Sequence, residues 1–115
     1  MAKKKEGFVN EIDRKEMYLK ELVEMYSVLD ENKMILLRPH LQQIAFLRVK
    51  LELLQDKINE TGVIEEYQNG ENQHGMKISA ALKSYNDTVK SFIQETKFVE
   101  AYLPAEKKVS KLSAL

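Results

Sequence analysis

Apolar residues recur at helical intervals in three stretches of the chain. In the first stretch they continue until Asp30, Glu31 and Asn32 interrupt the pattern with residues typical of helix caps. The apolar positions of this stretch are Ile12, Leu19, Leu22, Val23, Tyr26 and Leu29. The spacing predicts an amphipathic helix over about residues 9–29.

The second stretch contains Pro39, which is favoured in the first turn of a helix and costs a hydrogen bond deeper inside one. A second helix is therefore expected either to begin near Pro39 or to begin near Asn32 and bend at the proline. Thr61 and Gly62 supply the glycine typical of a helix C-terminus, so this helix is expected to end near Glu60.

The second helix is apolar on two sides. One side has the alternating steps of three and four that mark a coiled-coil seam: Ile44, Leu47, Leu51, Leu54 and Ile58. Phe46, Val49 and Leu53 form the other side, with the same steps. Both sides need cover. Either the other two helices provide it in a monomeric three-helix core, or the protein associates with itself, which makes Phe46, Val49 and Leu53 candidates for an oligomer or partner interface.

A third helix is expected to start near Ser79 and to fade before Pro104. Its apolar stripe is Ile78, Leu82, Tyr85, Val89 and Phe92. Before it, residues 63–67 have β character, and Asn69-Gly70 readily forms a tight hairpin turn. A small hairpin or rigid loop is one interpretation, and a plain long connection is the other. The predicted class is all-α, with a long hairpin of the second and third helices and a small β-hairpin-like loop between them.

Residues 32–104 carry a series of motifs whose order and spacing resemble those of small terminase subunits from tailed phages of Gram-positive hosts. The matching residues are Ala45-Phe46-Leu47-Arg48-Val49 with Leu51 and Leu54, then Gly62, the segment 66–77 with Ser79-Ala80, then Tyr85-Asn86 and Leu103-Pro104. Many members of that family carry a helix-turn-helix ahead of their oligomerisation helices, and the segment before Asp30 does not show one clearly.

The resemblance implies a non-enzymatic subunit that recognises viral double-stranded DNA and assists a large ATPase and nuclease subunit in genome packaging. Its expected partners are other copies of itself, the large terminase subunit and viral DNA. Polar loop residues whose amides and phenol can make directed hydrogen bonds are candidates for a subunit or partner contact, or else brace the loop itself. They are Tyr67, Asn69, Asn72 and Gln73.

The 115 residues fit one domain, expected over residues 9–103 between basic tails at 1–8 and 104–115. The formal net charge is zero, so any affinity for nucleic acid depends on where the charges lie. The tails contain Lys3, Lys4, Lys5, Lys107, Lys108 and Lys111. Lysine-rich ends keep a protein soluble, and they also bind phosphates where a nucleic acid is near.

Lys83, Lys90 and Lys97 repeat every seven residues in the third predicted helix and fall beside its apolar stripe. Three lysines in line can follow a phosphate backbone, and they can equally form an ordinary solvated face. Asp87 and Glu95 interrupt this basic field. Together with the tail lysines, these three are the candidate DNA-binding residues.

Nothing in the sequence predicts catalysis. His40 and His74 stand 34 residues apart without a second ligand at helical spacing, cysteine is absent, and no phosphate-binding loop or nucleophile elbow occurs. We therefore expect no enzyme activity, metal, cofactor or small-molecule substrate. No secretory signal or membrane span is recognisable, which predicts a protein of the host-cell cytoplasm. A second functional hypothesis is a helical adaptor that does not bind DNA.

Overall fold

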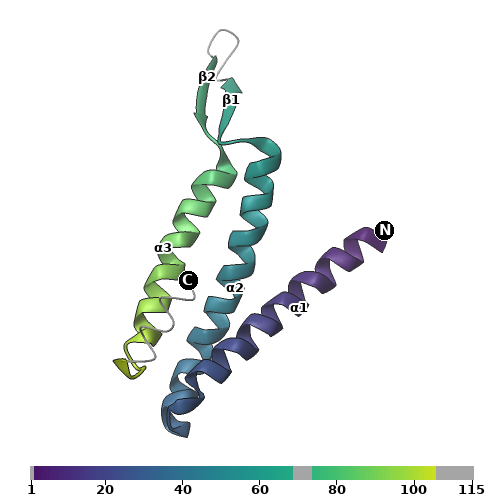
Figure 1. Ribbon diagram of the computed structural model, residues 1–115. Coiled ribbons are helices and arrows are strands. Elements are labelled where there is room, and N and C mark those ends of the chain that lie inside the picture. The colour runs from purple at the N-terminus through teal and green to yellow at the C-terminus, as the bar shows by residue number, and fades with distance from the viewer. Residues whose placement is uncertain (1, 69–73, 106–115) are drawn as a thin grey trace.

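The computed structural model describes the backbone of residues 2–68 and 74–105 and the side chains of residues 10–66 and 75–105. Three helices dominate it: α1 (Ala2–Met25), α2 (Glu31–Thr61) and α3 (Ala80–Glu100). A short 3-10 helix, η1 (Tyr26–Val28), follows α1, and strands β1 (Ile64–Gln68) and β2 (His74–Ile78) lie between α2 and α3 (Figure 1). The predicted all-α class, with a helical hairpin and a small β-hairpin between its arms, is confirmed.

The first helix differs from its expected bounds at both ends. It begins at Ala2 rather than near residue 9, in a segment whose three consecutive lysines, with Ala2 and Glu6, favour helix. It ends at Met25, and η1 then tightens the last turn as far as Val28. The chain reverses direction at Leu29 and Asp30, so α1 runs back alongside α2.

The structure selects the earlier of the two expected starts for α2. Asp30 caps the helix by accepting a hydrogen bond at Oδ1 from the backbone N–H of Lys33, at 2.9 Å. Pro39 consequently lies inside the helix. A proline at this position cannot bond the carbonyl of Ile35, four residues earlier, and Ile35 is exposed, so water can reach that end of the helix. The cap and the burial of Leu37 outweigh this missing bond.

The β-hairpin projects from the end of the α2–α3 pair (Figure 1). Gly62 ends α2 with a φ of 87°, a conformation that glycine adopts without strain. Ile64 pairs with Ile78 and Tyr67 with Gly75 in the antiparallel register. Ile78 therefore belongs to β2, although the sequence placed it in the stripe of the third helix. Ser79 begins α3, as expected, by accepting a hydrogen bond from the backbone N–H of Leu82.

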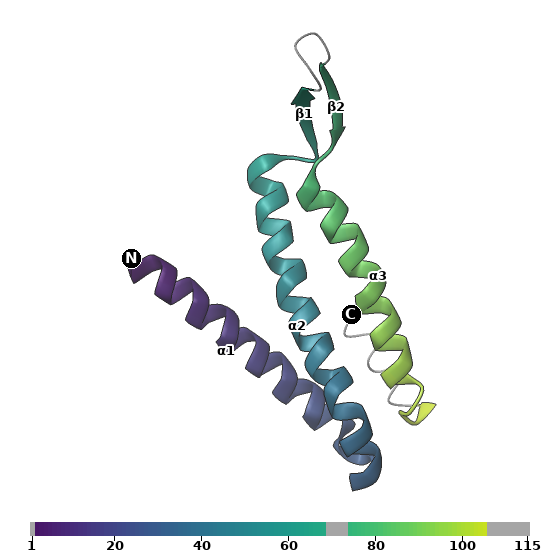
Figure 2. The ribbon, with the colours of Figure 1, turned by 180° about the vertical axis from the view of Figure 1, so that it is seen from behind.

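The main core lies at the end of the molecule farthest from the hairpin. Its buried members come from η1, α2 and the last part of the described chain: Tyr26, Leu37, Leu41, Ile44, Val99 and Leu103. A second, smaller cluster of Tyr18, Ala45 and Val49 joins α1 to α2. From behind, α2 is seen to run between α1 and α3 along the molecule (Figure 2).

The molecule is long for its size. It measures 62 × 35 × 24 Å with a radius of gyration of 18.3 Å, whereas a compact domain of this length would have about 13 Å. The helices α1 and α3 each pack on α2 and leave part of its surface open. The central helix thus keeps exposed apolar residues although two helices pack on it.

Candidate functional site

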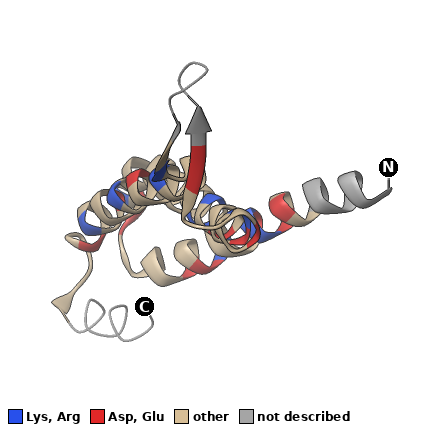
Figure 3. Cartoon of the chain, turned by 90° about the horizontal axis from the view of Figure 1, so that it is seen from above, with Lys and Arg blue, Asp and Glu red and all other residues tan. Residues whose placement is uncertain are grey.

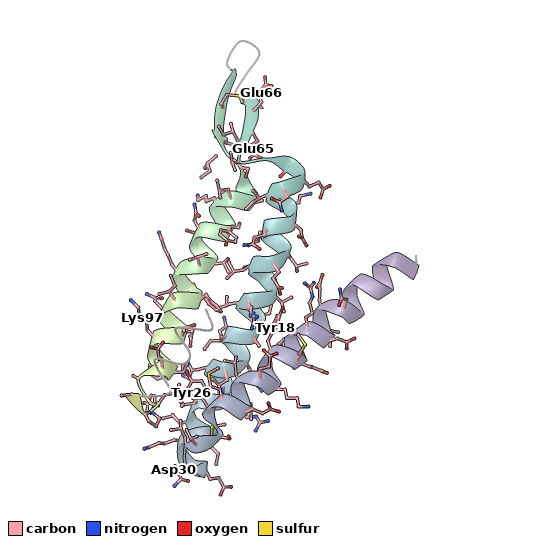
Figure 4. All side chains as sticks on the ribbon, viewed as in Figure 1. Tyr18, Tyr26, Asp30, Glu65, Glu66 and Lys97 are labelled. Carbon is pink, nitrogen blue, oxygen red and sulfur yellow. The ribbon has the colours of Figure 1, made fainter. Side chains whose placement is uncertain are left out.

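The three heptad-spaced lysines of α3 lie on the outer side of the helix. Lys83, Lys90 and Lys97 are all exposed, and by helical geometry they lie opposite Val99, which packs in the main core. Figure 4 shows the Lys97 side chain pointing away from α2. Successive lysines rise by about 10 Å along the axis. Among the described ion pairs, none involves any of the three.

Of the two acidic residues expected to interrupt this field, one turns inward. Glu95 faces α2, where its Oε2 lies 2.8 Å from His40 Nδ1. The His40 ring also lies 4.5 Å from the Phe98 ring, centroid to centroid. Asp87 stays exposed on α3. The outer side of α3 is therefore more uniformly basic than its sequence indicates.

The side chains of the remaining candidate lysines lie outside the described residues. Lys3, Lys4 and Lys5 lie in the first turn of the α1 backbone, but their side chains lie outside the described residues. Near the C-terminus, three further candidates lie wholly outside the described residues: Lys107, Lys108 and Lys111. Of the candidate DNA-binding lysines, those whose side chains the structure describes all lie on α3.

The three candidate interface residues of α2 have different environments. Val49 is only 6% exposed because it packs against Tyr18 of α1 within the same chain. Phe46 and Leu53 remain 46% and 36% exposed. Lys15 of α1 places its Nζ 5.8 Å from the centroid of the Phe46 ring. Cover by α1, one of the two expected alternatives, therefore applies to Val49 and leaves Phe46 and Leu53 available to a partner.

The polar loop candidates lie in or beside the hairpin. Tyr67 pairs with Gly75 through its backbone, and its side chain lies outside the described residues. Asn69, Asn72 and Gln73 also lie outside them. The described part of the hairpin exposes Ile64, Met76 and Ile78 on one face, since the register places these residues on the same side of the sheet.

The opposite face of the hairpin is polar. Glu65 and Lys77 stand opposite each other, with Oε1 and Nζ 3.6 Å apart. Figure 3 shows the acidic colour along β1, where Glu65 and Glu66 follow one another. Because the strand alternates, these two glutamates point to opposite sides of the sheet. Glu65 and Glu66 therefore do not form a paired-carboxylate site with each other.

A groove of about 520 Å³ opens between α1, α2 and α3. Its apolar lining is Leu22, Met25, Ile44, Leu51 and Phe92. Thr96 contributes to the wall, and its Oγ1 is buried without a hydrogen-bond partner among the described residues. The sequence did not reveal this groove, because it depends on the angle at which α1 leaves α2.

Polar contacts on one side of the groove fasten α1 to α2. The Tyr18 hydroxyl donates to the Glu52 carboxylate at 2.8 Å, and the Arg48 guanidinium stacks 3.8 Å from the Tyr18 ring centroid. Arg14 lies 3.8 Å from Glu52, and Arg48 lies 3.7 Å from Glu21. Burial, and then the bond to Glu52, raise the pKa of the Tyr18 phenol. These contacts hold the two helices together.

Tyr26 is the other perturbed tyrosine. Its side chain is fully buried in the main core (Figure 4). Burial and the nearby Glu100 carboxylate raise the pKa of its phenol far above the ordinary value. The phenol therefore stays protonated across the physiological range, as a structural group would.

Within residues 2–68 and 74–105, no group of three or more acidic or histidine side chains is placed to hold a metal ion. No helix in the same residues has the length and apolar character needed to cross a bilayer. Comparisons of the chain with models of protein families, with curated proteins and with solved structures found no match.

Proposed function

We propose that this protein is a non-enzymatic DNA-packaging subunit of the small terminase type, which binds viral double-stranded DNA and assists a large ATPase and nuclease subunit. Two independent considerations support the proposal. The first is the resemblance carried by the motifs in residues 32–104. The second, which carries the structural argument, is the row of exposed lysines on α3, Lys83, Lys90 and Lys97.

The lysine row suits a phosphate backbone for three reasons. The side chains are free of carboxylate partners among the described ion pairs, so binding DNA does not require an internal contact to break. Their spacing is regular, and α3 is long and projects them to one side. Such contacts position a protein on DNA without reading its sequence.

Self-association is part of the proposal. On the hairpin, Ile64, Met76 and Ile78 expose apolar side chains that a larger assembly would bury. The same exposed residues also favour the second candidate function, a helical adaptor that binds proteins and not DNA. Salt dependence separates the two functions, since only lysine–phosphate contacts release counterions.

The test is fluorescence anisotropy with a labelled 30-base-pair duplex across a salt series, comparing the wild type with Lys83→Gln/Lys90→Gln/Lys97→Gln. Each phosphate contact contributes about 0.9 to the slope of log affinity against log salt, so three contribute roughly 2.7. The ratio of wild-type affinity to variant affinity should therefore be about 40-fold larger at 50 mM salt than at 200 mM salt.

The matched control removes the same number of charges from exposed basic residues of α1 and the first turns of α2: Lys20→Gln/Lys33→Gln/Arg38→Gln. It should keep most of the slope. Equal losses in the two triple variants would mean that net charge alone attracts DNA, and an unchanged slope in the α3 variant would remove α3 from the interface. Light scattering coupled to size-exclusion chromatography, with and without duplex at two salt concentrations, then measures self-association. A monomer indifferent to DNA would favour the adaptor.

A further inference from the structure

Four exposed residues of α2 form a continuous row between the surfaces that α1 and α3 cover. Phe46, Lys50, Leu53 and Lys57 are separated by four, three and four residues, so they share one side of the helix. We call this row, together with Lys15 over the Phe46 ring, the α2 ridge. It alternates apolar and basic side chains along the axis.

The fold leaves the α2 ridge open. On one flank Tyr18 of α1 packs on Ala45 and Val49. On another side Leu47 is buried, consistent with the packing of α2 against α3. Phe46 and Leu53 lie between these covered positions and keep large exposed fractions. A pair of exposed apolar side chains one heptad apart on a rigid helix is the usual spacing of anchors for a second helix.

Charge decides which kind of helix fits. Lys15, Lys50 and Lys57 surround the two apolar side chains, and none of the three takes part in the described ion pairs. No acidic residue occupies a position in the row, although Glu60 lies beyond its last lysine. Asp56 and Glu60 follow Leu53 by three and seven residues, so the ridge is most basic at Phe46, where Lys15 lies over the ring and Lys50 follows one turn later.

This charge pattern argues against two simple occupants. A second copy packed across a two-fold axis would bring lysines against lysines, which is unfavourable. Duplex DNA would satisfy the lysines, but its phosphates and sugars offer no apolar surface for Phe46 and Leu53. An amphipathic helix that carries glutamates or aspartates beside an apolar stripe satisfies both features at once.

We propose that the α2 ridge binds an acidic amphipathic helix of a partner protein, with Phe46 and Leu53 packing on its apolar stripe and Lys15, Lys50 and Lys57 pairing with its carboxylates. The inference goes beyond the proposed DNA contact and does not depend on it, because the lysine row of α3 lies on the outer side of that helix, opposite its α2-facing side. The partner is defined by its chemistry, an acidic helix of several turns.

The test uses the full chain and two labelled synthetic peptides of about 18 residues, or five helical turns. Both have leucines at alternating steps of three and four, and one has glutamates beside them where the other has lysines. Fluorescence anisotropy should show the acidic peptide binding and the basic peptide not binding. Phe46→Ser/Leu53→Ser should weaken the acidic complex roughly tenfold or more.

The charge contribution is measured separately with Lys50→Gln/Lys57→Gln. This variant should weaken the acidic complex about three- to tenfold at low salt and have little effect at high salt, where the charges are screened. The α3 variant Lys83→Gln/Lys90→Gln/Lys97→Gln is the matched control and should bind the peptide like wild type. If this variant loses DNA and keeps the peptide, both proposals stand. If it keeps DNA, the proposed function fails, and if wild type and variant both fail to bind the acidic peptide, this inference fails.

Four results would overturn the inference. Equal binding of the two peptides, or no binding of either, would remove the charge argument. Loss of a protein oligomer in Phe46→Ser/Leu53→Ser would assign the α2 ridge to a second copy, and loss of duplex binding in Lys50→Gln/Lys57→Gln alone would assign it to DNA. Circular dichroism checks the fold of each variant, and if the apolar variant loses helix, the lysine variant decides the outcome.

Discussion

Replacing Tyr18 with phenylalanine tests how firmly α1 is attached to α2. The ring would keep its packing against Ala45 and Val49 and its contact with the Arg48 guanidinium, so the change removes only the hydroxyl. That hydroxyl donates to the Glu52 carboxylate. A hydrogen bond to a charged group contributes about 1.5–3 kcal/mol.

The expected cost is smaller than that full range. The Glu52 side chain is 35% exposed, so water can replace the lost donor. We expect Tyr18→Phe to lower the free energy of unfolding by about 1–2 kcal/mol. Urea denaturation followed by circular dichroism measures this change. Tyr85→Phe is the matched control, because the Tyr85 hydroxyl accepts a bond from Gln55 at an exposed site, and it should change stability by less than about 0.5 kcal/mol.

A double-mutant cycle with Glu52→Gln isolates the contact from other effects of the substitutions. The two changes should be non-additive by about 1 kcal/mol, because Tyr18→Phe removes the donor of this hydrogen bond and Glu52→Gln removes the charge that strengthens it. Additive effects, or a Tyr18→Phe protein as stable as wild type, would show that the hydroxyl does not hold α1 in place. The α1–α2 angle, and with it the groove, would then depend on the apolar cluster and on the ion pairs of Arg14 and Arg48.

Two further predictions concern the main core. Leu41→Ala should lower the free energy of unfolding by about 2–5 kcal/mol, since Leu41 is fully buried, and a loss below about 1 kcal/mol in the same urea assay would contradict the core assignment. The raised pKa of Tyr26 means that the folded state holds its proton more tightly than the unfolded state does, so its contribution to stability is present below about pH 10 and is lost as the pH rises further. Ultraviolet difference spectra should show Tyr26 ionising only as the protein unfolds, and ionisation in the native state near pH 10 would refute its burial.

Local signals predicted the element boundaries that depend on local chemistry. Ser79 was expected to open the third helix and does so as an N-cap. Gly62 was expected to close the second helix and does so with a positive φ. The start of α2 stayed open between two positions, because proline chemistry and capping chemistry pointed to different residues. The choice depends on whether Leu37 can be buried, which is a property of the whole fold.

Contacts between residues far apart in the chain could not be predicted from the sequence. His40 and Glu95 are 55 residues apart, and Tyr18 and Glu52 are 34 residues apart, and neither pair has a local signature. The periodicity correctly found that α2 is apolar on two sides. It could not show that Tyr18 would cover Val49 and leave Phe46 and Leu53 exposed, because this depends on the angle between α1 and α2.

The zero net charge of the chain conceals surfaces of different character. The lysine row of α3 is basic and has the exposed Ile93 at its flank, whereas the α2 ridge places Phe46 and Leu53 in line with its lysines. We expect both surfaces to attract polyanions at low salt, so a simple retention assay would not distinguish them. Salt-independent binding distinguishes the two surfaces, because burying Phe46 and Leu53 stabilises a complex at any salt concentration. A protein that uses both surfaces would lose affinity for DNA as salt rises but keep its helical partner. It would therefore release DNA while the protein partner stays bound.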